Sequence, residues 1–374
     1  MRLVSLSILI ATLWSATVIP LPALPLSKKE LCAIDVGKAN KTLALLRVSQ
    51  EEIPRYNDSS RRRYPRILCF AVTYSVHHET RVRATAETWG QRCDKLLFFS
   101  NMSDTIVVAA NTSAERRFKV VQLDIIADHK HLWLRTRAAL TYLHESFRHD
   151  YDWFYKCDDD TYMIVENMRA YLRRPEILER FHRQPMQLGH RLDLPKNLLE
   201  SYVQNKTELS LWYSRYDRMV FNSGGAGYVM NRLYLDKIVE SLPKSTCLPE
   251  GATVPIWEDV GVSFCMTRND VYPWDTRDHR GRDRWHTLSP HNVYIEYKAP
   301  NDWYIKYHKT LGGLRHHTES VAPDSVAFHY INPQAMYHLE RILYLCRSEH
   351  DDVSSYNTKF GLAIGDKVMV VEAS

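Results

Sequence analysis

Short apolar runs alternate with amphipathic segments in the first half of the chain. Four short runs predict strands: residues 67–72, Lys95–Phe99, Phe118–Leu123 and Asp152–Cys157. Three longer segments predict helices: His78–Trp89, His131–Phe147 and Met163–Leu172. The first run, Ile-Leu-Cys-Phe-Ala-Val, is continuously apolar, as in a strand that is buried on both faces. This β-α-β-β-α-β-α order predicts an α/β fold with a mostly parallel central sheet.

The N-terminal region has a different pattern. Residues 3–19 carry no charge, and Pro20, Pro22 and Pro25 follow them. The run is at the short end of what spans a membrane, about 17–25 residues. It also fits a cleaved signal peptide, but no small-x-small cleavage site ends it, which favours a signal anchor over residues 1–27. The basic residues flanking the run do not decide its orientation.

The rest of the chain divides into three further regions. Polar residues 28–64 are interpreted as a stem, residues 65–347 as one lumenal catalytic domain, and residues 348–374 as a variable tail. Asn-x-Ser/Thr sequons support a secretory location, and they begin at Asn40, Asn57, Asn101, Asn111 and Asn205. Chance predicts roughly one or two such sequons. The seven cysteines contain no Cys-x-x-Cys pair, so disulfides are favoured over a zinc or redox site.

Charge changes this interpretation little. The net charge is +5, and the one dense basic run, Arg61–Arg63 with Arg66, borders the predicted stem. A nucleic-acid-binding protein would concentrate basic residues on one face. We therefore expect no nucleic-acid partner. The chain also lacks the Gly-x-Ser-x-Gly, His-Glu-x-x-His and kinase motifs, so hydrolase and kinase functions have no support.

Three adjacent carboxylates, Asp158, Asp159 and Asp160, follow the fourth predicted strand. Ligands of α/β sheets bind beyond the carboxyl ends of strands, and oxygen ligands suit Mg²⁺ or Mn²⁺. A sugar nucleotide needs such a cation because its leaving group is a diphosphate. The alternative is structural, with Asp160 capping a helix that starts near Tyr162.

Three other motifs have both a structural and a functional interpretation. Glu258 and Asp259 begin a predicted helix, where they favour its dipole or supply a general base. His329, in the apolar segment Ala-Phe-His-Tyr, is either a core histidine or a third metal ligand. The turn with Gly224 and Gly225 is either a tight hairpin or a place where a sugar approaches the backbone closely.

Together these motifs resemble the core 1 β1,3-galactosyltransferase family over residues 66–347. The resemblance rests on Thr88–Cys93, Trp153–Tyr162, Ser223–Tyr228, Glu258–Val260, Thr276–His286, and Phe328–Tyr330 followed by Met336-Tyr337. It implies a GT-A-type fold, a UDP-galactose donor, a GalNAc-modified glycoprotein acceptor, Mn²⁺, and inversion at the anomeric carbon. It further implies a type II Golgi membrane protein with a lumenal catalytic domain, and it allows a homodimer.

The resemblance also assigns roles to residues. Asp160, Asp158 and His329 would hold the metal, and Asp158 and Asp159 would flank the donor. Asp259 would take the proton from the GalNAc 3-hydroxyl, and the neighbouring Glu258 would position Asp259. Gly224, Gly225 and Trp303 would shape the sugar sites. Family disulfides would join Cys69 to Cys93 and Cys247 to Cys265.

Several departures from the family pattern widen the options. Ala86 stands where the family has a basic residue, and Arg83, one helical turn earlier, is the expected substitute. Cys157 replaces a usual alanine, and an adjacent Cys-Cys pair is missing near His316-His317. The segment Pro195–Met219 is longer than usual. The alternatives are a β1,3-transferase with another donor or acceptor, and a non-catalytic lumenal chaperone-like relative. The intact aspartate triplet favours an enzyme.

Overall fold

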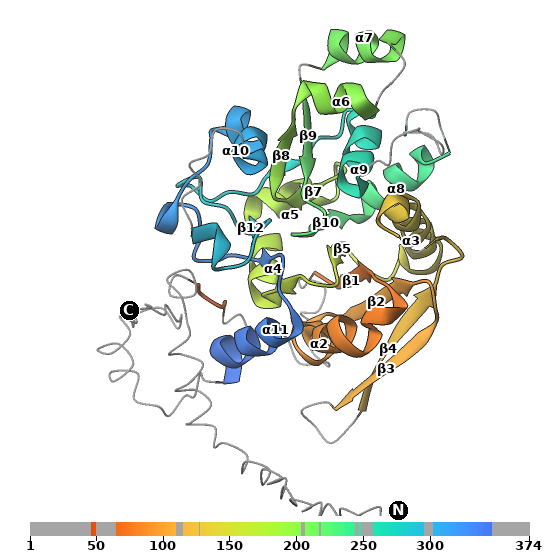
Figure 1. The fold of residues 1–374 in the computed structure, drawn as a ribbon, viewed down its shortest axis with the longest axis vertical. Helices are drawn as coiled ribbons and strands as arrows, with labels where there is room; N and C mark the ends of the chain where they lie inside the picture. Colours follow the sequence, from red (N-terminus) through yellow and green to blue (C-terminus); the bar gives the residue numbers. More distant parts are fainter. Residues whose placement is uncertain are drawn as a thin grey trace, which may run out of the picture.

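An eight-stranded sheet forms the centre of the molecule (Figure 1). The computed structural model describes residues 46–49, 65–109, 115–126, 128–202, 206–216, 218–243, 247, 257–294 and 302–345. In sheet order the strands are β11 (Trp274–Asp275), β7 (Gln187–Gly189), β10 (Tyr228–Asn231), β5 (Trp153–Asp158), β1 (Ile67–Val72), β2 (Lys95–Ser100), β4 (Glu115–Gln122) and β3 (Asp104–Ala109). The adjacent strands β5, β1, β2 and β4 are parallel, and β10 and β3 join the sheet antiparallel.

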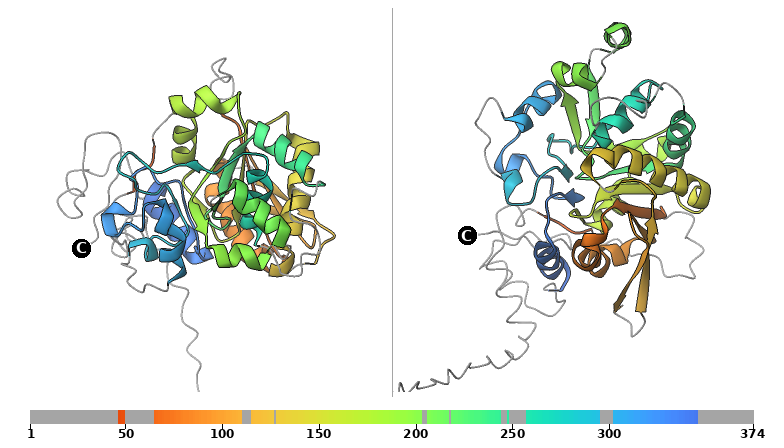
Figure 2. Two further views of the ribbon diagram at one scale, coloured as in Figure 1. Left: turned by 90° about the horizontal axis from the view of Figure 1, so that it is seen from above. Right: turned by 45° about the vertical axis from the view of Figure 1, so that its right-hand side comes forward.

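Helices cover both faces of the sheet, which makes a three-layer α/β architecture (Figures 1 and 2). The α-helices are α2 (Arg83–Glu87), α3 (Leu132–Phe147), α4 (Val165–Leu172), α5 (Pro175–Phe181), α6 (Lys196–Tyr202), α7 (Lys206–Arg215), α8 (Arg232–Ser241), α9 (Glu258–Thr267), α10 (Trp303–His308) and α11 (Pro333–Glu340). Short 3₁₀ or π turns cover Ser75–His77, His78–Val82, Trp89–Arg92, His129–His131, Asn292–Tyr294, Lys309–Leu311, His317–Glu319 and Arg341–Leu345.

The central strand β1 is buried on both faces because it lies between these two helical layers. Its odd-numbered side chains, such as Ile67 and Cys69, pack with apolar residues of α2, α4 and α11. Its even-numbered side chains, such as Leu68 and Phe70, pack with residues of α3, α8 and α9. Each large apolar side chain buried in this way stabilises the fold by about 1.5–3 kcal/mol. This confirms the α/β fold with a largely parallel centre that the apolar runs predict.

Two smaller sheets flank the main one. β12 (Trp285–His286), β13 (Ala327–Phe328) and β6 (Tyr162–Met163) form a three-stranded sheet in that order. β8 (Arg191–Leu194) and β9 (Met219–Asn222) form an antiparallel ribbon. β13 pairs with β6, which directly follows the aspartate triplet, so a strand near residue 328 lies beside residues 158–160. This pairing positions the candidate site.

The structure differs from the sequence prediction in three places. β3 was not predicted, although Ile106 and Val108 alternate with polar or exposed neighbours and face the core. It pairs with β4 as an antiparallel hairpin at the sheet edge. The predicted helix His78–Trp89 is a π turn followed by α2, which ends at Glu87. The glycine turn is not a hairpin, because β9 pairs with β8 whereas β10 pairs with β5 and β7.

Two disulfides are present within the described residues, and both match the expected pairs. Cys69 on β1 is bonded to Cys93, and Cys247 is bonded to Cys265 on α9. Cys157 has a buried free thiol. Within the described residues, no helix is both long enough and apolar enough to cross a membrane. The expected anchor, nearly all of the expected stem and the expected tail lie outside the described residues.

Candidate active site and metal centre

The aspartate triplet lies at the carboxyl end of β5, beside the carboxyl end of β1. Asp159 is buried, and its carboxylate accepts hydrogen bonds from Thr73 (Oγ1–Oδ2, 2.5 Å), His77 (Nδ1–Oδ2, 2.8 Å) and Arg81 (NH1–Oδ1, 3.0 Å). Both oxygens therefore have partners within the protein. Asp159 ties the loop after β1 to the loop after β5, and its neighbours Asp158 and Asp160 face elsewhere.

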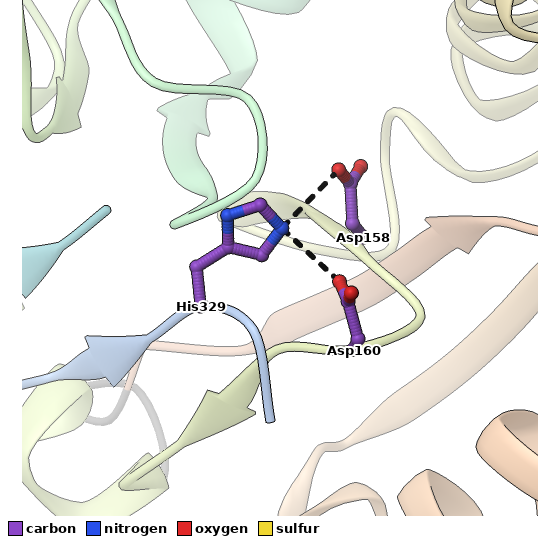
Figure 3. A group of neighbouring side chains, drawn as sticks. All are labelled: Asp158, Asp160 and His329. Carbon is purple, nitrogen blue, oxygen red and sulfur yellow. Dashed lines mark ion pairs between the residues drawn. The ribbon is translucent and has the colours of Figure 1, made fainter. Parts of the chain in front are cut away.

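Asp158 and Asp160 both face His329, which directly follows β13 (Figure 3). His329 Nε2 lies 3.1 Å from Asp160 Oδ1 and 3.7 Å from Asp158 Oδ2. The backbone holds this segment in place, because Ile331 N–H donates to the carbonyl of Asp160 at 2.8 Å. Tyr330, which lies between His329 and Ile331 in the chain, adopts a left-handed φ of 57°. This conformation is uncommon for a residue with a side chain.

These three residues suit a divalent cation. One ligand atom from each can be chosen so that all lie within 4.8 Å of one another. Two adjacent ligand atoms of an octahedral ion, each about 2.1 Å from it, lie about 3 Å apart. The distances from His329 Nε2 to the carboxylates of Asp160 and Asp158, 3.1 Å and 3.7 Å, are close to this value. Carboxylates suit Mg²⁺ or Mn²⁺ and imidazole suits transition metals, so the set fits a divalent metal ion. Within the described residues, this is the one such group of three.

Lys156, on β5, links this cluster to a second pair of acids. Its fully buried ammonium contacts Asp158 Oδ1 at 2.8 Å, Glu258 Oε2 at 2.9 Å and the carbonyl of Gly224 at 3.3 Å. Burial disfavours the charged amine, but the charges of Asp158 and Glu258 outweigh it and raise the Lys156 pKa. Burial would raise the pKa of Asp158, but Lys156 and His329 lower it. Both groups are therefore charged at neutral pH.

Glu258 and Asp259 begin α9, whose N-cap is Trp257, and both line the cavity of the site. Glu258 is buried and accepts a hydrogen bond from the Tyr228 hydroxyl at 2.5 Å. Asp259 accepts from Gly224 N–H (Oδ2) and Val260 N–H (Oδ1), each at 2.9 Å. Burial, with the charge of Glu258 adding to it, raises the Asp259 pKa to about 6. A carboxylate with this pKa is ionised at neutral pH and can accept a proton.

The glycine turn fits closely between these groups. A Cβ on Gly225 would lie 2.0 Å from the His329 ring, and a Cβ on Gly224 would lie 2.4 Å from Glu258 Oε2. No side chain fits at either position without displacing a site residue. The two glycines therefore let the backbone approach both the candidate metal ligand His329 and the pair of acids that begins α9.

A cavity of about 310 Å³ connects the candidate metal ligands to Asp259. Asp158, His329, Glu258 and Asp259 all line it. The remaining lining residues are His129, Leu132, Leu192, Phe221, Ser223, Gly224, Gly225, Trp257, Thr287, Trp303, Tyr307 and Tyr330. Trp257, Trp303 and Tyr330 are about half exposed. The predicted residue Trp303 is thus at the cavity, and aromatic rings of this kind suit contact with a sugar face.

The structure does not bring Arg83 to the aspartates. Its guanidinium pairs with Glu79 at 2.7 Å and Glu87 at 3.6 Å, and it donates to the carbonyl of Val107 on β3. Arg81 lies beside the triplet instead, 3.0 Å from Asp159 and 3.3 Å from Asp160. The expectation that Arg83 contacts the donor is therefore corrected. Arg83 and Ala86 do lie one turn apart in α2, but the Arg83 side chain is directed to Glu79, Glu87 and β3.

The alternative of a helix cap at Asp160 is also excluded. α4 begins at Val165, its N-cap is Ile164, and no side chain caps it. Sequence reasoning missed Lys156 and Tyr228 as well as Arg81. Lys156 had a signal, since a lysine within an otherwise apolar strand needs a buried partner. Tyr228 had none, because its hydroxyl acquires a partner only when folding brings it to Glu258 at the start of α9.

The chain has sequence similarity to known proteins over the same region. A family model described as Fringe-like matches residues 66–276. The chain is 26% identical over 285 residues to glycoprotein-N-acetylgalactosamine 3-beta-galactosyltransferase 1 of Xenopus laevis. That alignment covers 76% of this chain and 67% of the Xenopus protein. The family match includes the aspartate triplet and the start of α9 but ends before His329.

Proposed function

Since this chain belongs to the Fringe-like family of GT-A-type glycosyltransferases, we propose that it transfers galactose from UDP-galactose to GalNAc on glycoproteins. The bond is formed to the 3-hydroxyl of GalNAc-α-Ser/Thr with inversion, which gives the core 1 O-glycan. The main support is the cavity, whose lining brings two of the three candidate metal ligands, Asp158 and His329, together with the partly buried carboxylate of Asp259. The printed name of the Xenopus relative supports the same sugar and linkage.

Asp158, Asp160 and His329 would hold the metal ion, and Mn²⁺ is the proposed ion. When bound, such an ion offsets the negative charge that develops on the diphosphate leaving group. Arg81, beside Asp160 and about one third exposed, is placed to add positive charge on the phosphate side. Asp159 holds Arg81 and the loop after β1 in this arrangement.

Asp259 is the proposed general base. Its carboxylate takes the proton from the acceptor 3-hydroxyl as the oxygen attacks the anomeric carbon from the face opposite the leaving group. Gly224 N–H and Val260 N–H fix the orientation of this carboxylate. Glu258 keeps its own charge paired with Lys156 and raises the proton affinity of Asp259. Gly224 and Gly225 leave room for the sugar at the cavity wall.

We place this reaction in the Golgi lumen, with residues 1–27 as a type II anchor. The two disulfides agree with an oxidising compartment, and so do the five sequons. A homodimer is consistent with this placement and is tested by sedimentation of the purified protein.

The experiment is a transfer assay with the purified full chain in detergent. UDP-galactose and a GalNAc-Thr peptide are incubated with Mn²⁺ or with EDTA, and the product linkage is determined by permethylation and mass spectrometry. Mn²⁺-dependent β1,3 product is expected. Asp160→Ala should abolish product while the variant stays folded by circular dichroism. Product of equal yield in EDTA would contradict the proposed metal role.

The donor and acceptor are tested in the same assay. UDP-galactose, UDP-GlcNAc and UDP-GalNAc are compared on GalNAc and fucose acceptors. The longer segment Pro195–Met219 connects β8 and β9, and Leu192 of β8 and Phe221 of β9 line the cavity. This segment is the observation that favours another acceptor. A higher kcat/KM on fucose than on GalNAc would replace the proposed acceptor but keep the enzyme class. Failure to bind UDP would favour a non-catalytic, chaperone-like role.

A further inference from the structure

One of the five sequons lies within the described residues, in the turn between β2 and β3. Its residues Asn101, Met102 and Ser103 are all exposed. Because β2 is parallel to β1 and β1 is parallel to β5, this turn lies at the same edge of the sheet as the aspartate triplet. An N-glycan is bulky and needs a surface loop, which this turn supplies. The other four sequons begin outside the described residues, at Asn40, Asn57, Asn111 and Asn205.

The Asn101 side chain is held in place by the loop after β1. Its Oδ1 accepts a hydrogen bond from Ser75 N–H at 2.9 Å, and its Nδ2 donates to Ser75 Oγ at 3.2 Å. A backbone N–H can only donate, which fixes the orientation of the amide. The amide nitrogen has two hydrogens, and glycosylation replaces one of them. The other hydrogen stays available, so the glycosylated side chain can keep both bonds to Ser75.

Exposed apolar side chains flank this amide. Met102 directly follows Asn101 and is 49% exposed. Val76 directly follows Ser75 and is 78% exposed. Ile126, which is 65% exposed, lies beyond the carboxyl end of β4, the strand on the other side of β2. Single exposed apolar residues are ordinary on a protein surface, but three on neighbouring loops form a patch that calls for a cover.

This patch lies outside the catalytic cavity. Among the described residues that line the cavity, none belongs to the patch, and neither Ser75 nor Asn101 is included. The loop after β1 meets the candidate site through Thr73 and His77, whose side chains contact Asp159. A glycan attached to Asn101 therefore starts beside this loop and not within the cavity.

We propose that Asn101 carries an N-linked glycan that covers the patch, an assignment that rests on the proposed lumenal location. In the attachment, Nδ2 forms a bond to C1 of the first sugar of a lipid-linked oligosaccharide. The bond from C1 to the lipid diphosphate breaks, the diphosphate leaves with the electron pair, and the proton lost by Nδ2 is released to water. Sugar rings have apolar C–H faces, and the fixed amide directs the first sugar over Val76 and Met102. The glycan is thus a structural part of this edge.

Occupancy is measured on the full chain expressed in cells that have an N-glycosylation pathway. Peptides are treated with peptide N-glycosidase F in ¹⁸O water, which converts a glycosylated asparagine to labelled aspartate, and are analysed by mass spectrometry. Residue 101 should be labelled in wild type and in Thr105→Ala, and not in Ser103→Ala. Thr105→Ala is the matched control, since it removes an exposed hydroxyl two residues later and leaves the sequon intact.

The sequons outside the described residues separate two kinds of failure. An unlabelled Asn101 in a chain that is labelled at another sequon overturns the site but leaves the lumenal location standing. A chain without label at any sequon overturns both the site and the location. Neither result depends on sugar transfer by the protein, so the proposed activity is judged separately.

The covering role is measured by oxidation of Met102 with hydrogen peroxide, followed by peptide mass spectrometry. A sugar that lies on the thioether slows its conversion to the sulfoxide. Met102 should be oxidised about fivefold faster in Ser103→Ala, since oxidation follows exposure, than in wild type or Thr105→Ala. Ser103→Ala keeps the bonds between Asn101 and Ser75, and native wild type treated with peptide N-glycosidase F should match it. Equal Met102 rates with and without the glycan overturn the covering role.

Discussion

Lys156 holds together two groups of acids that would otherwise repel each other. Its ammonium is fully buried and contacts both Asp158 and Glu258, one on the candidate metal side and one on the candidate base side. Removing a buried charge from its partners typically costs about 3–5 kcal/mol, because the remaining charge loses its compensation. Asp158 is partly exposed, so most of this penalty falls on Glu258.

This argument predicts that Lys156→Met lowers the free energy of unfolding by about 3–5 kcal/mol in urea titrations. The double variant Lys156→Met/Glu258→Gln should recover a large part of that loss, because it also removes the buried negative charge. If the double variant is as unstable as the single one, the loss comes from packing and not from the charge pair.

Asp259 makes the proposed reaction sensitive to pH. Its pKa is raised to about 6, mainly by burial, so the carboxylate is protonated below that pH and cannot accept a proton. We predict that kcat/KM rises with pH through a midpoint near 6 and is flat above about pH 7. Asp259→Asn should lower kcat by about 10²–10⁴-fold and leave a residual rate without that midpoint. A wild-type profile that is flat between pH 5 and 7 would exclude Asp259 as the base.

At the scale of elements, α9 carries the candidate base and is fixed by a disulfide. Cys265, within α9, is bonded to Cys247, which lies 18 residues earlier. The second disulfide joins Cys69 to Cys93, 24 residues apart, and fixes β1 to the segment before β2. The two bonds close loops of similar length, so the loop-closure argument gives each about 3 kcal/mol. The two disulfides support different parts of the fold. Cys247–Cys265 holds α9, which carries Asp259, whereas Cys69–Cys93 holds β1.

We therefore predict different effects on activity for similar effects on stability. Cys247→Ser/Cys265→Ser and Cys69→Ser/Cys93→Ser should each lower the free energy of unfolding by about 3 kcal/mol. Only the first pair should also reduce kcat in the folded protein, because it frees the helix that orients Asp259. Equal kcat values for the two variants, measured well below their unfolding temperatures, would show that this disulfide does not position the base.

At the scale of the whole molecule, the site depends on segments that are far apart in the chain. The candidate metal ligands come from the end of β5 and from the residue after β13, and these belong to different sheets. The pairing of β13 with β6 is short, with two residues in each strand. A bound metal ion would therefore join the C-terminal part of the fold to the central sheet.

This predicts that Mn²⁺ with UDP stabilises the whole fold. At 100 times its dissociation constant, a ligand that binds only the folded state adds about 2.7 kcal/mol. The unfolding midpoint measured by differential scanning calorimetry should rise accordingly, and Asp160→Ala or His329→Ala should remove the rise. Ca²⁺ is a useful comparison because it prefers more oxygen ligands at longer distances. An equal rise in both variants would place the ion elsewhere.

The sequence by itself determined the local elements and the chemistry available to them. The run Ile67–Val72 has to be buried on both faces, since no polar residue interrupts it, and it lies at the centre of the sheet. Asp158–Asp160 follow a buried strand, and so they lie at the sheet edge where ligands bind. These predictions rest on short-range periodicity and on the motifs of one family. Both are present in the amino-acid sequence whether or not the chain is folded.

Tertiary structure alone decided which groups meet. The three adjacent aspartates look equivalent in sequence, but Asp159 is turned to Thr73 and Arg81, and only Asp158 and Asp160 face His329. Arg83 was expected at the donor and lies against Glu79, whereas Arg81 contacts the triplet. Side-chain direction depends on local backbone geometry and on strand pairings between residues about 170 positions apart, such as Tyr162 with Phe328. Neither leaves a periodic signal in the sequence, so only the folded chain defines the site.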